Sequence, residues 1–173
     1  MPACFNYRSL VSRLLFQRQY VLYLSFSILT LNAIGQGNEK NPVAFLRLNE
    51  VNSRASRHFL NHFSQATSVR WVRDKNFYIA GFETASTRSR VYYRSNGNFA
   101  FCLKNYLADG LNPDLKTAIL RKFPGCQITM VTELTEQDNK AFFVNIKSGA
   151  YIKTLLCNDD GIEEMENIIN AGI

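Results

Sequence analysis

The sequence predicts an α+β fold of two tandem units, each a helix packed on an antiparallel β-meander sheet. Two observations lead to this prediction. In each half, the apolar pattern changes from a helical spacing to short alternating strands separated by turn residues. The two halves also match each other, since Phe63 aligns with Phe123 at an offset of 60 and Gly97 aligns with Gly161 at an offset of 64.

The first 35 residues have the layout of a secretory signal peptide. A basic stretch without acids, "MPACFNYRSLVSRLLFQRQ", precedes the apolar run "YVLYLSFSILTLNAIG" and the polar stretch "QGNEKNP". Ala33 and Gly35 fit the small positions of a cleavage site before Gln36, and an uncleaved membrane anchor is the alternative. We expect a signal peptide over 1–35, a flexible leader over 36–51, and export to the periplasm or the exterior.

Composition and charge narrow the functional class. The 173 residues suffice for one ordinary domain or two small halves, and the 46% hydrophobic content argues against global disorder. Cleavage would leave 17 basic and 14 acidic residues, a net charge of +3 instead of +6. That balance is well short of a nucleic-acid-binding protein, so we expect no nucleic-acid partner and, after cleavage, no membrane span.

Three cysteines follow the expected cleavage site: Cys102, Cys126 and Cys157. An odd number cannot all pair within one chain, and the wide spacings match no zinc motif. The sequence favours small core residues, with one disulfide plus a free thiol as the alternative.

The first unit opens with a helix at about 52–65, where Phe59, Leu60 and Phe63 form an apolar stripe. Four aromatic and β-branched segments follow with turn residues between them, and they predict a four-stranded meander: "VRWVR", "NFYIAGFE", "SRVYYR" and "NFAFCLK".

The second unit opens with a helix that is capped by Asn112 and carries Pro113 in its first turn. Leu115, Ile119 and Phe123 form its apolar face. Three further strands are expected in "CQITMVTEL", "KAFFVNIK" and "AYIKTLLC", and "NDDG" forms a turn before a last strand or short helix in "IEEMENII".

The hairpin "RVYYRSNGNFAFCLK" has two possible registers. A two-residue Asn96–Gly97 loop would mix arginines with large apolar groups on one face, whereas a three-residue loop with a left-handed Gly97 pairs Tyr93 with Phe99. Burial favours the second register, because a slip of one residue exchanges the faces. The dry face is then predicted to hold Val91, Tyr93, Phe99, Phe101 and Leu103, and the open face Arg90, Tyr92, Arg94, Asn98, Ala100 and Cys102.

Three motifs of the first unit, "FSQATSVRW", "FYIAGFE" and "VYYRSNG", resemble the PepSY-like, β-lactamase-inhibitor-like domains exported by Bacteroidetes-type bacteria. "ILRKFPGCQITMVTEL", "AFFVNI" and "CNDDG" resemble them in the second unit, and Arg94 stands where the family often has Asp. The resemblance implies a PepSY-like domain over 52–173, with repeats at about 52–108 and 109–173. It also implies export, no known catalysis, and binding or inhibition of other proteins.

Catalytic and metal sites are not predicted. His58 and His62 share a helix face, but no further ligand accompanies them, so surface or boundary histidines are favoured over a metal site. "NDDGIEE" lacks the ligand spacing of a calcium loop and is typical of a charged turn. Motifs of nucleophilic enzymes and of phosphate loops are missing from the sequence, which indicates a non-enzyme without cofactors.

The basic half supplies the candidate binding residues. Residues 68–104 carry seven basic and two acidic side chains, a net charge of +5. A solvated sheet face is one interpretation, and a surface that attracts an acidic protein or an anionic envelope polymer is the other. Trp71 is expected in the core, with a half-exposed position on a binding sheet as the alternative. We hypothesise a module that binds or inhibits an envelope or secreted protein, alternatively a small molecule or anionic polymer, and the candidate contacts are Arg90, Tyr92, Arg94, Arg70 and Tyr78.

Overall fold

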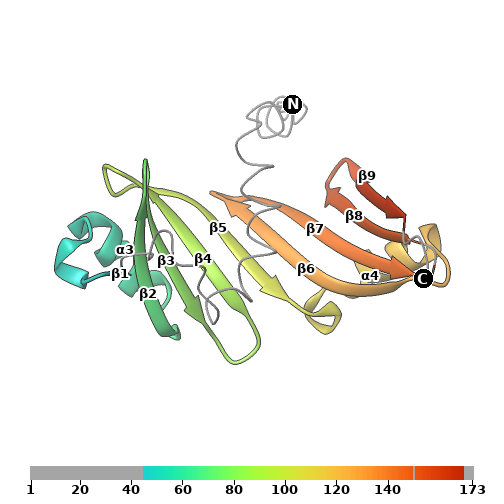
Figure 1. Ribbon diagram of the computed structural model, residues 1–173, viewed down its shortest axis with the longest axis horizontal. Coiled ribbons are helices and arrows are strands. Elements are labelled where there is room, and N and C mark those ends of the chain that lie inside the picture. The colour runs from blue at the N-terminus through green and yellow to red at the C-terminus, as the bar shows by residue number, and fades with distance from the viewer. Residues whose placement is uncertain (1–44, 150, 170–173) are drawn as a thin grey trace, which may run out of the picture. The chain divides into compact units, whose positions relative to one another are not determined.

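The computed structural model describes residues 45–149 and 151–169 (Figure 1). The predicted signal peptide and the predicted leader as far as residue 44 lie outside this part. Residues 45–51 were also assigned to the leader, and the first two of them pair with a strand: Phe45 lies opposite Val72 and Leu46 opposite Trp71. Val51 is buried.

The described elements follow one another as β1 (Phe45–Leu46), η2 (Leu48–Glu50), α3 (Ser53–His62), β2 (Thr67–Asp74), β3 (Phe77–Glu83), β4 (Arg88–Arg94), β5 (Phe99–Tyr106), η3 (Ala108–Gly110), α4 (Pro113–Lys122), β6 (Gln127–Glu136), β7 (Asn139–Ser148), β8 (Tyr151–Asn158) and β9 (Gly161–Ile169). All nine strands belong to one sheet, each beside the next in sequence. Every neighbouring pair is antiparallel. The segment "IEEMENII", left open between strand and helix, lies in strand β9.

The predicted division into two tandem helix-plus-sheet units is wrong. Strands β5 and β6 pair from Cys102 opposite Thr135 to Tyr106 opposite Val131, across the place where the boundary was expected. The segment that contains α4 brings the chain back so that β6 lies alongside β5. The backbone groups at the open edge of the first meander therefore form hydrogen bonds with the second meander. One continuous nine-stranded sheet with two helices results (Figure 1).

Both long helices begin after an asparagine cap, and the cap at Asn112 confirms a prediction from the sequence. The side chain of Asn52 accepts a hydrogen bond from the Arg54 amide at 3.0 Å, and that of Asn112 accepts one from the Asp114 amide at 2.8 Å. Neither helix, at ten residues each, is long or apolar enough to cross a membrane.

The two helices cover the same face of the sheet. Cys102 packs against the α3 cluster and Tyr106 belongs to the α4 cluster, and residues four apart on one strand point to the same side. The α3 cluster comprises Val51, Ala55, Phe59, Trp71, Tyr78, Ala80, Phe82, Val91 and Tyr93. Trp71 therefore has the core position that was expected.

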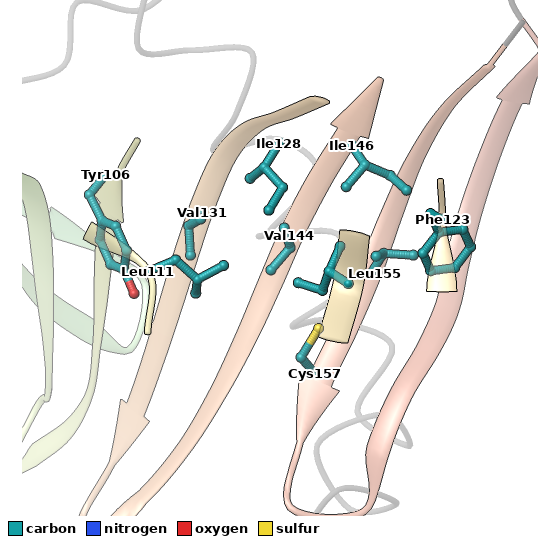
Figure 2. Packing of buried hydrophobic residues seen from close by; sticks show 10 residues of the cluster. Tyr106, Leu111, Phe123, Ile128, Val131, Val144, Ile146, Leu155 and Cys157 are labelled. Carbon is teal, nitrogen blue, oxygen red and sulfur yellow. The ribbon is translucent and has the colours of Figure 1, made fainter. Parts of the chain in front are cut away.

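The α4 cluster fills the other half of the helix side. Its buried members are Tyr106, Leu111, Ile119, Phe123, Ile128, Val131, Val144, Ile146, Leu155 and Cys157. Figure 2 shows these side chains gathered along strands β5 to β8. Ile119 and Phe123 confirm the predicted apolar face of this helix.

The β4–β5 hairpin confirms the predicted three-residue loop. Gly97 has φ +82°, its amide donates to the Arg94 carbonyl at 2.8 Å, and Tyr93 lies opposite Phe99. The rest of the predicted register is wrong, because the pairing shifts between Tyr92 and Tyr93.

Ala100 is the extra residue in this β-bulge, and it turns the following side chains over. Phe101 then pairs with Tyr92 and Leu103 with Arg90, on the face away from the helices. Cys102 pairs with Val91 and packs towards α3, although an outward position was predicted for it. The sheet is consequently apolar on both faces at its centre.

Candidate functional site

The helix-free face of the sheet is the candidate binding surface. The strand registers arrange its side chains in rows that run across the strands. An apolar row consists of Val72, Ile79, Tyr92 and Phe101. An arginine row beside it consists of Arg70, Gly81, Arg90 and Leu103.

The apolar row has a rigid aromatic end. The rings of Tyr92 and Phe101 stack with centroids 4.3 Å apart and an interplanar angle of 18°. Phe77 meets both rings edge-on, with centroid distances of 6.0 and 6.1 Å. Tyr92 is 4% exposed and Phe101 8%, whereas Val72 and Ile79 are half-buried. Two deeply buried rings thus support a partly accessible aliphatic end.

The arginine row is open in its middle. Gly81 lies between Arg70 and Arg90, so the row lacks a side chain at this point. A Cβ placed on Gly81 would meet, among the described residues, only the Arg70 carbonyl oxygen at 3.9 Å. The Arg70 guanidinium carbon lies 5.6 Å from the Phe45 ring centroid, a cation–π distance.

Arg90 is half-buried near the centre of the basic half. Within the described residues, no carboxylate lies within 4.0 Å of it. The acid closest along the neighbouring strand is Glu83, whose Oε1 lies 3.1 Å from Nε of Arg88. Arg90 thus has a charge that the described chain does not balance by a direct ion pair.

Polar pairs extend this face towards β6 and β8. Thr132 is buried and donates its hydroxyl to Oδ1 of Asn105 at 2.7 Å, and Thr154 donates to Oδ1 of Asn145 at 3.0 Å. These hydrogen bonds satisfy the hydroxyl groups internally, so they contribute to the stability of the sheet.

Four of the five predicted contact residues lie on the helix-free face: Arg70, Arg90, Tyr92 and Arg94. Arg70 and Arg94 are exposed, and Tyr92 is buried beneath the surface. Tyr78 lies apart from them. It is 8% exposed within the α3 cluster, and the Arg73 guanidinium carbon lies 5.1 Å from its ring centroid.

Several solved structures have a similar fold. A BLIP-like protein from Bacteroides fragilis superposes with a TM-score of 0.55 and 14% identity, over 78% of this chain and 92% of that one. The fold is BLIP-like. A DUF2874 family protein from Bacteroides uniformis matches with a TM-score of 0.55 and 14% identity, over 69% of this chain and 90% of that one.

A third match, with a TM-score of 0.54 and 14% identity, is a protein from Bacteroides eggerthii that is inferred to be periplasmic. It covers 68% of this chain and 87% of that one. No family model matches the chain, and no curated protein matches it in sequence. At this level of identity the BLIP-like likeness concerns the fold.

On the helix side, His58 and His62 occupy the edge of the α3 cluster. Their rings stack with centroids 4.0 Å apart, and Nδ1 of His58 lies 3.0 Å from the Tyr93 hydroxyl. Burial and the neighbouring His62 lower the pKa of His58. His58 is half-buried and His62 exposed, which fits the expected surface or boundary positions.

Glu133 lies on the helix side of β6, opposite Lys104. Its carboxylate contacts Nζ of Lys140 at 2.8 Å and accepts the Tyr106 hydroxyl at 3.2 Å. Burial opposes ionisation, but the hydrogen bond and charge of Lys140, the Tyr106 hydrogen bond and the Lys104 charge together lower the pKa of Glu133.

The three cysteines of the described chain are free thiols. Burial raises the pKa of Cys102 to about 12 and that of Cys157 to about 11. Cys102 and Cys126 pack against the two clusters and Cys157 lies inside one, as expected for small core residues.

"NDDG" forms the expected charged turn, where the Asp160 amide donates to Oδ1 of Asn158 at 3.0 Å. Over the described residues, no group of three or more His, Cys, Asp and Glu side chains could hold a metal ion. A groove of about 570 Å³ lies between α4 and the β8–β9 turn, lined by Leu115, Ala118, Arg121, Lys122, Asn158, Gly161 and Ile162. Lys122 donates to the Ile162 carbonyl at 2.6 Å within it.

Proposed function

We propose that this protein is an exported, non-enzymatic binding module that binds or inhibits an envelope or secreted protein through the helix-free face of its sheet. The BLIP-like and periplasm-assigned structures with the same fold support export and protein binding. From the sequence motifs we also propose that the domain is PepSY-like.

The observation that carries the proposal is the composition of the helix-free face. Val72, Ile79 and Phe77 are half-buried apolar side chains, and the half-buried Arg90 lies beside them. Protein interfaces combine an apolar centre with Arg and aromatic residues in this way. The stacked rings of Tyr92 and Phe101 hold the surface rigid, which reduces the entropy lost when a partner binds.

The test is affinity capture from envelope and culture extracts of the source cells, with the protein purified in the form that its expressing cell produces. We compare the wild type with Ile79→Asp, which places a charge in the apolar row. The matched control is Leu120→Asp, which places the same charge on an exposed position of α4. Both variants are first checked for a native thermal unfolding transition.

We expect a stoichiometric protein that is captured by the wild type and by Leu120→Asp but is lost with Ile79→Asp. Equal capture by Ile79→Asp would show that the helix-free face is not the binding surface. A ligand that survives protease treatment of the extract would contradict protein binding and favour a small molecule or an anionic envelope polymer.

A further inference from the structure

Gly81 leaves a gap in the arginine row, between Arg70 and Arg90. We propose that a carboxylate group of the partner enters this gap and is bound there by the guanidinium groups of the two arginines. This inference rests on the proposed function and specifies its chemistry: the partner presents an Asp or Glu side chain next to an apolar residue.

The strand register sets the geometry of this arginine pair. Arg70 and Arg90 lie on either side of Gly81 in one row across β2, β3 and β4. Adjacent strands are about 4.8 Å apart, so the two arginine Cα atoms are about 10 Å apart, within the combined reach of two arginine side chains. In the structure the Arg70 guanidinium lies 5.6 Å from the centroid of the Phe45 ring on β1, the strand on the side of β2 away from Gly81, so Arg70 has to turn towards β3 to meet Arg90 over the glycine.

Gly81 supplies the space. Any other residue at this position of β3 would have a side chain on the helix-free face, and that side chain would occupy the gap. The described atom nearest to a methyl group placed at this position is 3.9 Å away, which is ordinary contact. The position above Gly81 thus has room for a Cβ atom, and it lies between two positively charged residues, Arg70 and Arg90.

Electrostatics favour an anion here. Arg90 is half-buried, and the nearby Glu83 is already engaged by Arg88 at 3.1 Å. A carboxylate accepts hydrogen bonds from guanidinium groups in a planar, two-pronged geometry, and such charge-assisted bonds are among the stronger ones. Binding would provide Arg90 with the counter-charge that no described ion pair supplies.

The neighbouring row indicates that the anion is part of a protein. Val72 lies two residues from Arg70 and Ile79 two residues from Gly81, on the same face. An apolar strip directly beside an anion site suits an acidic side chain flanked by an apolar one. A polymer that presents only phosphates or sulfates would leave this strip uncovered.

The experiment uses isotope-labelled protein, again in the form that its expressing cell produces, and follows backbone amide NMR signals. The probes are the peptides acetyl-Leu-Glu-Phe-amide and acetyl-Leu-Gln-Phe-amide. We expect the Glu peptide to shift the amide signals of Gly81, Arg70 and Arg90 saturably, with an affinity about tenfold above that of the Gln peptide. Equal affinities of the two peptides would overturn the proposal.

Three variants make the test specific. Arg90→Met and Gly81→Leu should each weaken binding of the Glu peptide about tenfold, one by removing the charge and the other by filling the gap. Arg73→Met removes the same charge from an exposed position of β2 on the helix side, opposite Tyr78, and should change the affinity less than about twofold. Equal weakening by Arg73→Met would reduce the effect to general charge attraction and overturn the proposal.

Two further results separate this inference from the proposed function. Tighter binding of inorganic polyphosphate than of the Glu peptide at Gly81 would overturn the assignment to a protein carboxylate. In the capture experiment, full capture by Arg90→Met together with loss by Ile79→Asp would overturn the arginine pair and leave the proposed function standing. Full capture by Ile79→Asp would overturn the proposed function itself.

Discussion

Tyr92 and Phe101 stack on the helix-free face with their ring centroids 4.3 Å apart, because Ala100 forms a bulge in β5. Without the extra residue, Phe101 would point towards the helices and Cys102 away from them. The bulge therefore decides which side chains form the binding surface and which form the core. Its effect can be measured as the reactivity of Cys102, which the bulge turns towards the core.

We expect the thiols of Cys102 and Cys157 to resist alkylation in the native protein. Burial raises their pKa values to about 12 and about 11, so both are protonated at pH 8 and the reactive thiolate is scarce. Iodoacetamide labelling at pH 8 followed by peptide mass spectrometry measures this, with denatured protein as the fully labelled control. Rapid labelling of Cys102 alone would contradict the bulge at Ala100 and support the predicted register, in which Cys102 lies on the open face.

Replacing Gly97 with Ala should lower the free energy of unfolding by about 2 kcal/mol or more. Its φ of +82° is unfavourable for a residue with a Cβ, and the added atom would collide with Asn52 and lie 2.9 Å from Cβ of Arg54. Gly125→Ala is the matched control. Gly125 has φ +76° but no described atom within 4 Å of the added Cβ, so we expect a cost of only about 1 kcal/mol. Chemical denaturation measures both.

Glu133→Gln should destabilise the protein by about 1–2 kcal/mol at pH 7, since it removes charge-assisted hydrogen bonds with Lys140 and Tyr106. The pKa of Glu133 is lowered from 4.5, so its stabilisation is present above the unfolded-state pKa and is lost as the pH falls through the folded-state pKa. Denaturation curves from pH 7 to 3 should therefore converge for wild type and variant.

The control for this measurement is Glu83→Gln, which breaks an exposed pair with Arg88 and should change stability by less than about 0.5 kcal/mol. A difference between wild type and Glu133→Gln that stays constant down to pH 3 would show that the carboxylate charge is not the cause.

Removing His62 should raise the pKa of His58. Burial and then His62 lower it from 6.5, and His62→Asn eliminates the second contribution. Because the folded-state pKa is lowered, the contribution of His58 to stability is present above about pH 6.5 and is lost as the pH falls through its folded-state value. NMR titration of the histidine ring protons in both proteins tests this, and an unchanged His58 pKa would contradict the role of the stack.

Local structure was largely predictable from the sequence. The cap Asn112 and the turn at Gly97 each depend on neighbouring residues, and the structure agrees with them. The joining of β5 to β6 could not be deduced in this way, because strand pairing between distant segments leaves no local pattern. Because the pairing of β5 with β6 was not predicted, the chain was incorrectly divided into two units.

The binding face was predicted only in part for a related reason. Alternation assigned Arg90, Tyr92 and Arg94 to one face correctly but could not place Phe101, since bulges interrupt the period of two. One signal was present. The five consecutive apolar residues from Phe99 to Leu103 are typical of a strand that is covered on both faces.

The central claim is that the helix-free face binds the partner, and isothermal titration tests it most directly. The captured protein is titrated into wild type, Ile79→Asp and Leu120→Asp. We predict that Ile79→Asp weakens binding by about tenfold or more while Leu120→Asp matches the wild type. Unchanged affinity of Ile79→Asp, with a native unfolding transition, would contradict the claim.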